Sequence, residues 1–479
     1  MSKSYSVLKK IATLPLALCT LLPAQTTTEK MNREALEYFT TMVKMDTSFP
    51  PGNETKLAKY LADILQREGI PSKLVGENPD RLSLIATLKG SGVKKPIIVM
   101  GHTDVVPVQR DRWTEDPFGA KIVDGYVWGR GSSDDKGLVT GALMTMLLLK
   151  RSGVALDRDV IFVAESGEEG GGAMPGPPTY GIRYLVEHNW PDIDAEYCLT
   201  EGGSYVSTAG KLLYQKVELT DKFGRGMKLV AEGTAGHGSM PREDNAIAHL
   251  AGAVARIAAW QPPMHLTDIT RTYFERLAQV SEPEEAARYK DLFIASKTAA
   301  AQEWFRKNNI EVNAMLRTTI SPNIIEGGIK SNIIPSMASA TLDIRAVPGE
   351  DMEKFRKLMT DVINDPQVKI VSSQPSRAEA PPTTTSTEMY RVLETVQKEM
   401  FPSVITLPAM STGGTDMTAL RGKGMSCYGI GPERPTEDRV THAAHSDNER
   451  LKESALYDFV RYEYNVVRKM AVHEASSSQ

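Results

Sequence analysis

The chain has 479 residues, too many for one ordinary hydrophobic core, and its length suits two domains. Apolar residues make up 41% of the chain and charged residues 24%, which are the proportions of a soluble globular protein. The net charge of -4 gives no electrostatic reason to expect nucleic acid or an anionic membrane as a partner. Peptides and other small molecules are therefore the expected ligands.

The N-terminus is typical of a secretory signal. Lys3, Lys9 and Lys10 precede the apolar run IATLPLALCTLLPA, and the polar QTTTEK follows it. We expect a signal peptide over residues 1–24 and a secreted or periplasmic protein. The run is too short to cross a bilayer, and no membrane span is predicted elsewhere. Cys19 leaves lipidation open, although Leu18 before it is larger than such processing favours.

Two cysteines follow the signal, Cys198 and Cys427. This number excludes a disulfide scaffold and disfavours a zinc site made of thiolates. Any metal site must therefore use histidine, aspartate and glutamate.

Short apolar runs alternate with helical stretches along the chain. Helical periodicity covers residues 31–44 and 55–68. The runs PIIVMGHTD, DVIFVAES, AEYCLTE and GMSCYGIGP are typical of buried parallel strands, and KGLVTGALMTMLLLKRSG of a buried helix between two of them. The pattern predicts an α/β fold with a central, mostly parallel sheet flanked by helices.

A smaller α+β unit interrupts this fold over residues 215–375. Its strands KVELTD and GMKLVAEG alternate apolar and polar residues, and the linker SSQPSRAEAPPTTTST marks its end. Because the strand GMSCYGIGP follows the linker, the unit is inserted into a larger domain made of residues 25–214 and 376–479. Within the insert, residues 268–309 are additional, mostly helical and charged material.

Most of the predicted core strands are followed by a residue that can bind a metal ion. Open α/β sheets bind ligands beyond the carboxyl ends of their strands, so these side chains should meet at one rim. Side chains two positions apart on a strand share a face, so the first two in the sequence have the geometry of a ligand and its orienting partner. Five carboxylates and two imidazoles would repel one another there unless cations lay among them. The residues are His102, Asp104, Asp134, Glu168, Glu169, Glu201 and His445.

The motifs around these residues resemble those of a known family. In chain order they are GHTDVVP, WGRGSSDDKG, GEEGGG, TEGGS, GTAGHGSMP, SNIIP, GGTDM and HAAHSDNE. In this order they are similar to the co-catalytic di-zinc amidohydrolases and exopeptidases that include carboxypeptidase G, aminoacylase and succinyl-diaminopimelate desuccinylase. The resemblance runs from Asn32 to Lys469.

The resemblance implies two Zn²⁺ ions per chain, a site that would also accept Mn²⁺ or Co²⁺. One ion would be held by His102 and Glu201 and the other by Glu169 and His445, with Asp134 bridging both. His442 competes with His445, and we prefer His445 because the family's Ser/Asp/Asn and Glu pattern follows it directly.

The resemblance also implies the roles of neighbouring residues. Asp104 would accept the free ring N–H of His102, and the peptide bond from Asp134 to Asp135 would be cis. Glu168 would be the general base that takes a proton from the attacking water.

The remaining implied residues would contact the substrate. His237, in the inserted lid or dimerisation domain, would stabilise the oxyanion, often across a homodimer interface. Asn332 and Arg345 would grip a substrate carboxylate, and Gly414 and Thr415 would lie near it; for Arg345 a plain salt bridge is the alternative.

These implications favour a di-zinc metallopeptidase of carboxypeptidase type, which cleaves an amide bond next to a free carboxylate. An N-acyl-amino-acid amidohydrolase with the same site is the alternative, and the substrate would be a small peptide or an N-acyl amino acid. A non-catalytic metal or peptide binding protein is a remote alternative, because a binder has no need of Glu168. Two departures from the family stand out: the stretch GGGAMPGPPTYG, which could shape the pocket, and the segment 268–309, which could replace the usual dimer interface.

Overall fold

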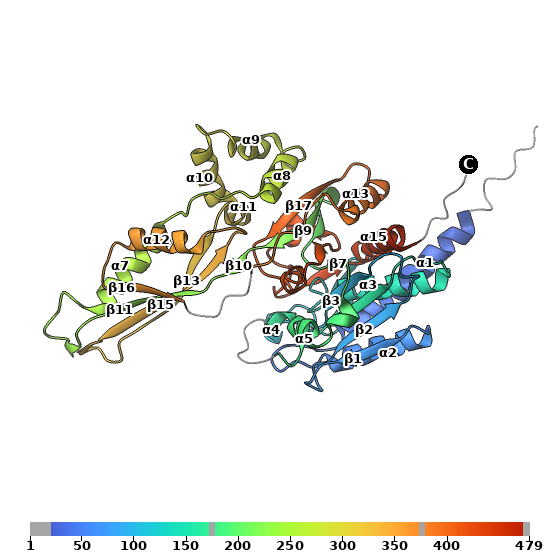
Figure 1. Ribbon diagram of the computed structural model, residues 1–479, viewed down its shortest axis with the longest axis horizontal. Helices are drawn as coiled ribbons and strands as arrows, with labels where there is room; N and C mark the ends of the chain where they lie inside the picture. Colours follow the sequence, from blue (N-terminus) through green and yellow to red (C-terminus); the bar gives the residue numbers. More distant parts are fainter. Residues whose placement is uncertain (1–20, 172–177, 373–378, 473–479) are drawn as a thin grey trace, which may run out of the picture.

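The structure is a computed structural model that describes residues 21–171, 178–372 and 379–472. Most of the expected signal peptide and half of the stretch GGGAMPGPPTYG lie outside the described residues. Figure 1 shows a larger α/β part and a smaller part that extends away from it. No helix in the described ranges is long and apolar enough to cross a membrane.

A ten-stranded sheet forms the centre of the larger part. Its four middle strands, in the order β6-β3-β7-β18, are parallel to one another, and they coincide with the four predicted apolar runs. The bounds are β3 (Ile97–His102), β6 (Val160–Glu165), β7 (Tyr197–Thr200) and β18 (Ser426–Gly429). The predicted fold class is therefore confirmed.

The other strands extend this sheet on both sides. They are β1 (Ser72–Val75), β2 (Ser83–Leu88), β8 (Ser204–Thr208), β9 (Lys211–Asp221), β17 (Ile405–Ser411) and β19 (Arg434–Pro435). A separate three-stranded sheet consists of β4 (Lys121–Val123), β5 (Tyr126–Trp128) and β20 (Arg450–Lys452).

Helices cover both faces of the ten-stranded sheet because neighbouring strand residues point to opposite faces. Along β3, Ile97 and Val99 pack into one apolar cluster, whereas Ile98 and Met100 pack into another. The first cluster contains α1 (Leu21–Val43), α2 (Thr55–Arg67), α3 (Lys136–Ser152), α13 (Glu388–Met400) and α15 (Glu453–Ala471). The second contains α5 (Gly181–His188), α6 (Trp190–Ile193) and α14 (Met417–Arg421).

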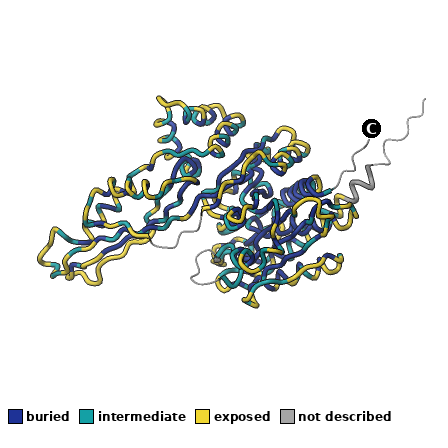
Figure 2. The backbone as a smooth tube through the Cα atoms, in the orientation of Figure 1, coloured by how far each residue is buried: buried dark blue, intermediate teal, exposed yellow. Residues whose placement is uncertain are grey.

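The smaller part is built on a five-stranded antiparallel sheet. Its strands are β10 (Phe223–Gly224), β11 (Met227–Glu232), β13 (Thr319–Gly327), β15 (Met337–Ala346) and β16 (Val368–Ser372). The helices α7 (Ala246–Ala259) and α12 (Met352–Ile363) pack on it, and β12 (Gly236–His237) pairs with β14 (Ile333–Ile334) beside it. Figure 2 shows that the far end of this part is largely exposed.

The two parts meet later in the chain than the predicted boundary at 215. β9 belongs to the larger sheet, because β17 pairs with it in parallel from Tyr214 to Asp221. The five-stranded sheet begins only at Phe223.

The additional helical segment packs on the larger sheet. It consists of α8 (Asp268–Leu277), α9 (Pro283–Asp291), α10 (Thr298–Asn308) and α11 (Ile310–Met315). Phe274, Tyr289 and Phe305 stack in its interior, with ring centroids 5.8 and 5.0 Å apart. The same apolar cluster includes Leu407 and Ala409 of β17. The segment is thus anchored to the larger part.

Candidate metal centre

The carboxyl ends of the central parallel strands bring the expected ligands to one rim. β3 ends at His102, α4 (Glu168–Gly171) begins shortly after β6, and Glu201 directly follows β7. Asp134 lies just before α3 and His445 lies in the loop before β20. Residues far apart in the sequence therefore meet because the strands that carry them are parallel.

Two groups of side chains at this rim could each hold a metal ion, and they share Asp134. The first is His102, Asp134 and Glu201, and the second is Asp134, Glu169 and His445. Oδ1 of Asp134 lies 2.9 Å from Nε2 of His102, and Oδ2 lies 3.2 Å from Nε2 of His445. The two carboxylate oxygens thus face different imidazoles, as a bridging ligand requires.

The outer ligands complete these groups. Nε2 of His445 lies 2.8 Å from Oε1 of Glu169, and Nε2 of His102 lies 3.9 Å from Oε2 of Glu201. A third group, His102 with Glu168 and Glu169, also has ligand atoms close together. Nitrogen and carboxylate oxygen are ligands that Zn²⁺ accepts, so the residues present fit a pair of divalent cations.

The electrostatics of the rim also fit cations. Burial and the neighbouring Glu168 raise the pKa of Glu201 well above its usual range, and burial together with Asp416 does the same for Glu168. Hydrogen bonds to Asp134 and Glu169 raise the pKa of His445 to about 10. Protons are thus retained where carboxylates crowd together, and divalent cations would relieve the same repulsion.

The Asp104 carboxylate contacts the His102 ring and a neighbouring loop. Nδ1 of His102 lies 3.0 Å from the backbone carbonyl of Asp104 and 3.5 Å from its carboxylate. The carboxylate also accepts backbone N–H bonds of 2.9 to 3.1 Å from Gly167, Glu168 and Glu169. Asp104 therefore holds the start of α4, which carries the expected base and one expected ligand.

Glu449 supports the shared ligand from the opposite side. Its buried carboxylate accepts the backbone N–H groups of Gly131, Ser133 and Asp134 at 2.7 to 3.1 Å, and it pairs with Arg130 at 2.6 Å. The peptide bond between Asp134 and Asp135 is cis, as the resemblance implies. The loop that carries Asp134 is thus fixed by a residue more than three hundred positions later.

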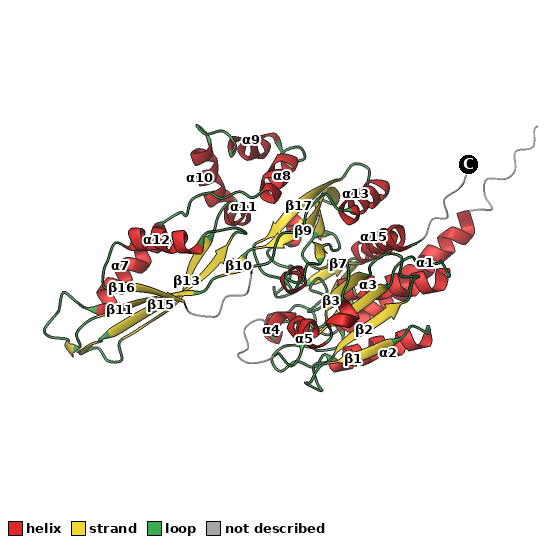
Figure 3. Cartoon of the chain, in the orientation of Figure 1, coloured by secondary structure: helices red, strands yellow, loops and turns green. Residues whose placement is uncertain are grey.

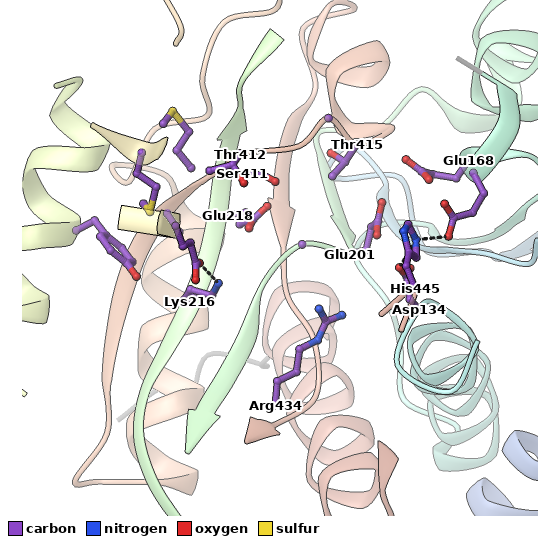
Figure 4. A pocket seen from close by; sticks show the side chains of 18 residues that line it. Asp134, Glu168, Glu201, Lys216, Glu218, Ser411, Thr412, Thr415, Arg434 and His445 are labelled. Carbon is purple, nitrogen blue, oxygen red and sulfur yellow. Dashed lines mark hydrogen bonds and ion pairs between the residues drawn. The ribbon is translucent and has the colours of Figure 1, made fainter. Parts of the chain in front are cut away.

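A cavity of about 310 Å³ opens beside the two ligand groups (Figure 4). Glu168 lines it next to the ligands, as do Gly414 and Thr415. The backbone N–H and hydroxyl of Thr415 lie 3.4 and 3.3 Å from Oδ2 of Asp221. Asp221 in turn forms a buried ion pair of 2.9 Å with Arg421. Asp221, at the end of β9, therefore fixes the loop after β17 that carries Thr415.

Three expected substrate contacts are not among the residues that line this cavity. His237 lies on the smaller part, exposed, with Nδ1 2.7 Å from the hydroxyl of Ser239. Asn332 is its neighbour, because its backbone carbonyl accepts the N–H of Gly238 at 2.8 Å. Arg345 pairs with Asp343 at 2.9 Å and is about two-fifths exposed. The structure does not bring these residues together with the metal ligands.

His442 does not belong to either of the two ligand groups that share Asp134. Its Nδ1 lies 3.0 Å from the backbone carbonyl of Asn448, and its ring packs against Trp128 at 5.2 Å. The preference for His445 therefore agrees with the geometry of the described residues.

Sequence reasoning missed the residues that position this site. Glu449 lies inside the motif HAAHSDNE without an implied role, and Asp221 and Arg421 lie outside the family motifs. In the sequence, such charged residues look like solvated surface positions. Only their burial in the fold reveals them.

The fold and the metal-binding rim together define a metal-dependent hydrolase. A family model described as peptidase family M20/M25/M40 matches residues 98–469, and the chain belongs to this family. The resemblance found in the sequence motifs is thereby confirmed.

The chain is similar to a probable carboxypeptidase S-like 2 of Dictyostelium discoideum, with 31% identity over 70% of this chain and 64% of that protein. It is also similar to the N-fatty-acyl-amino acid synthase/hydrolase PM20D1 of Homo sapiens, with 25% identity over 91% of this chain and 87% of that protein. Its fold resembles the M20 family metallo-carboxypeptidase Sso-CP2 from Sulfolobus solfataricus, with a TM-score of 0.65, 19% identity and coverage of 91% and 98%.

Proposed function

We propose that this hydrolase cleaves an amide bond next to a free carboxylate, with two divalent cations, Zn²⁺ first among them. The observation that carries the proposal is Asp134, whose two oxygens face the imidazoles of two ligand groups. His102 and Glu201 would hold one cation, and Glu169 and His445 the other. When bound, the cations would polarise the amide carbonyl and lower the pKa of a water between them.

Glu168 is the proposed general base. It lines the cavity beside both ligand groups but belongs to neither of the two groups that share Asp134. A buried carboxyl whose pKa is raised is suited to accept a proton from the attacking water and return it to the leaving amine. Through backbone hydrogen bonds, Asp104 positions the start of α4, which carries the base, and Glu449 positions the loop that carries Asp134.

The inserted domain is proposed to supply the rest of the site. His237 would stabilise the oxyanion, and Asn332 with Arg345 would grip the carboxylate, after the domain moves or a second subunit contributes them. A homodimer through this domain is supported by β13, which carries the exposed side chains of Ile324 and Ile325. Export of the protein by its N-terminal signal is likewise our proposal.

Both proposed substrate classes, peptides with a free C-terminus and N-acyl amino acids, present the same amide and carboxylate to this site. A hydrolysis panel on the zinc-reconstituted protein tests the proposal, using dipeptides, N-acetyl amino acids and their C-terminal amides. We expect hydrolysis of compounds with a free carboxylate and a loss of at least tenfold in kcat/KM for the amides. Equal rates for acids and amides would contradict the proposed carboxylate grip.

A further inference from the structure

The cavity continues beyond the metal ligands, and its far part is lined by charged groups that no role described above uses. The additional helical segment lines this part together with β9, β17 and β19, and Figure 4 shows Lys216, Glu218, Ser411 and Arg434 around it. The side chains there are Lys216, Glu218, Tyr273, Glu311, Met315 and Arg434. A polar lining of this kind is unsuited to a long apolar group.

Arg434 is a cation of this region that forms no close ion pair with a carboxylate among the described residues, although its charge acts on the nearby Asp134 and Glu218. Its Nη2 donates a hydrogen bond of 3.0 Å to the carbonyl of Ser133, and its Nε is buried without a partner. By contrast, Arg439 and Lys216 both approach Glu311, at 3.2 and 3.6 Å. Arg434 also lines an adjoining cavity of about 230 Å³, so it lies in the wall between the two.

Glu218 lies nearby but does not form an ion pair with Arg434. It is 5% exposed, and its Oε2 has no hydrogen-bond partner among the described residues. Gly202, next to the ligand Glu201, has a φ of +112°, and a Cβ there would lie 2.5 Å from that oxygen. Burial raises the pKa of Glu218 to about 8. Arg434 therefore keeps hydrogen-bonding capacity, at its buried Nε, that no described residue of this cavity uses.

We propose that Arg434 binds a second carboxylate, carried by the acyl part of the substrate. This inference rests on the proposed function, which assigns the carboxylate beside the scissile amide to the inserted domain and leaves the acyl part to this side. A guanidinium group binds a carboxylate through paired hydrogen bonds, whereas a neutral acyl group would leave it without a counter-charge. The favoured substrates are amino acids acylated by a dicarboxylic acid, or peptides with an acidic residue at the same position.

Two matched substrates test this assignment. N-succinyl-leucine carries the distal carboxylate, and N-succinamoyl-leucine replaces it with an amide while keeping the shape, the scissile bond and the carboxylate of leucine. We expect the zinc-loaded protein to prefer the succinyl compound at least tenfold in kcat/KM. Arg434→Gln should reduce that preference by about tenfold or more, chiefly through a higher KM for the succinyl compound, and Arg434→Lys should restore part of it.

A matched control uses the neighbouring guanidinium. Arg439→Gln should keep the preference within about threefold, because Glu311 already pairs with Arg439. The inference is overturned if the unaltered protein hydrolyses both compounds equally well, or if Arg439→Gln removes the preference to the same extent. It is also overturned if Arg434→Gln slows both compounds equally, since Arg434 would then act on the Asp134 loop through Ser133. Failure to hydrolyse these compounds and N-acetyl-leucine alike would overturn the proposed function, and this inference with it.

Discussion

The rim of the larger sheet and the tip of the smaller part differ in how far their functional side chains are fixed. At the rim, buried Asp104 and Glu449 hold the ligand loops through backbone hydrogen bonds. In the smaller part, His237 is exposed and its ring nitrogen is bonded only locally, to Ser239. The candidate metal ligands are thus held in place, whereas the proposed substrate contacts of the smaller part lie away from them, which predicts different consequences for substitutions in the two regions.

The largest effect should come from the shared ligand. Asp134→Ala should lose both metal ions and lower turnover by on the order of 10⁴ or more, because the rim would lose its bridge. Metal content measured by atomic emission, together with initial rates, checks this. Glu201→Ala is the comparison, since it belongs to one ligand group only and should release one ion. Retention of one ion by the Asp134 variant would contradict the bridging role.

Substitution of the proposed base Glu168 should affect turnover without affecting metal binding. Glu168→Gln keeps the shape of the side chain but cannot accept a proton, so metal content should stay while kcat falls by about 10² to 10⁴. The same metal and rate measurements apply. A variant that keeps near-normal turnover would show that another group takes the proton.

A substitution of His237 tests the smaller part of the structure, which lies apart from the metal ligands. His237→Ala should lower kcat and kcat/KM together by about 10² to 10³ with metal content unchanged, because an oxyanion donor acts in the transition state. If the histidine acts across a dimer, mixing this variant with the Glu168→Gln variant should restore part of the activity. No recovery after proven subunit exchange would place His237 in its own chain's site.

Lys222, at the junction of the two parts, should produce the smallest effect. It donates hydrogen bonds to the carbonyl of Ala314 and the hydroxyl of Thr319, and burial lowers its pKa to about 7. An unfolded lysine stays protonated up to about pH 10. Between these values the unfolded chain binds the additional proton, so this group makes the folded state more stable as pH rises from about 7 to 10.

Chemical denaturation at pH 7, 8 and 9 checks this linkage. The free energy of unfolding of the unaltered protein, minus that of Lys222→Met, should increase with pH by at most ~1.4 kcal/mol per unit. Metal-free protein keeps ligand titration equal in both samples. A difference that does not change with pH would mean that Lys222 remains charged in the fold.

The sequence predicted what depends on local patterns. The four central strands are continuous apolar runs, and the metal ligands follow strand ends, so both could be read without a structure. β9 was assigned to the insert because its partner β17 lies almost two hundred residues later. The positioning roles of Asp221 and Glu449 could not be predicted either, because they depend on tertiary contacts that bury these charged residues.

The anchoring of the helical segment to the larger sheet constrains the mechanics of the inserted domain. The chain crosses between the two parts at Lys222, and again over 260–267 and 316–318. A domain joined by one entering and one leaving segment could rotate in several directions. Each additional connection between the parts removes some of these rotations. The domain should therefore swing about one preferred axis, and shortening the crossing at 260–267 should limit the amplitude of that swing without touching a single ligand.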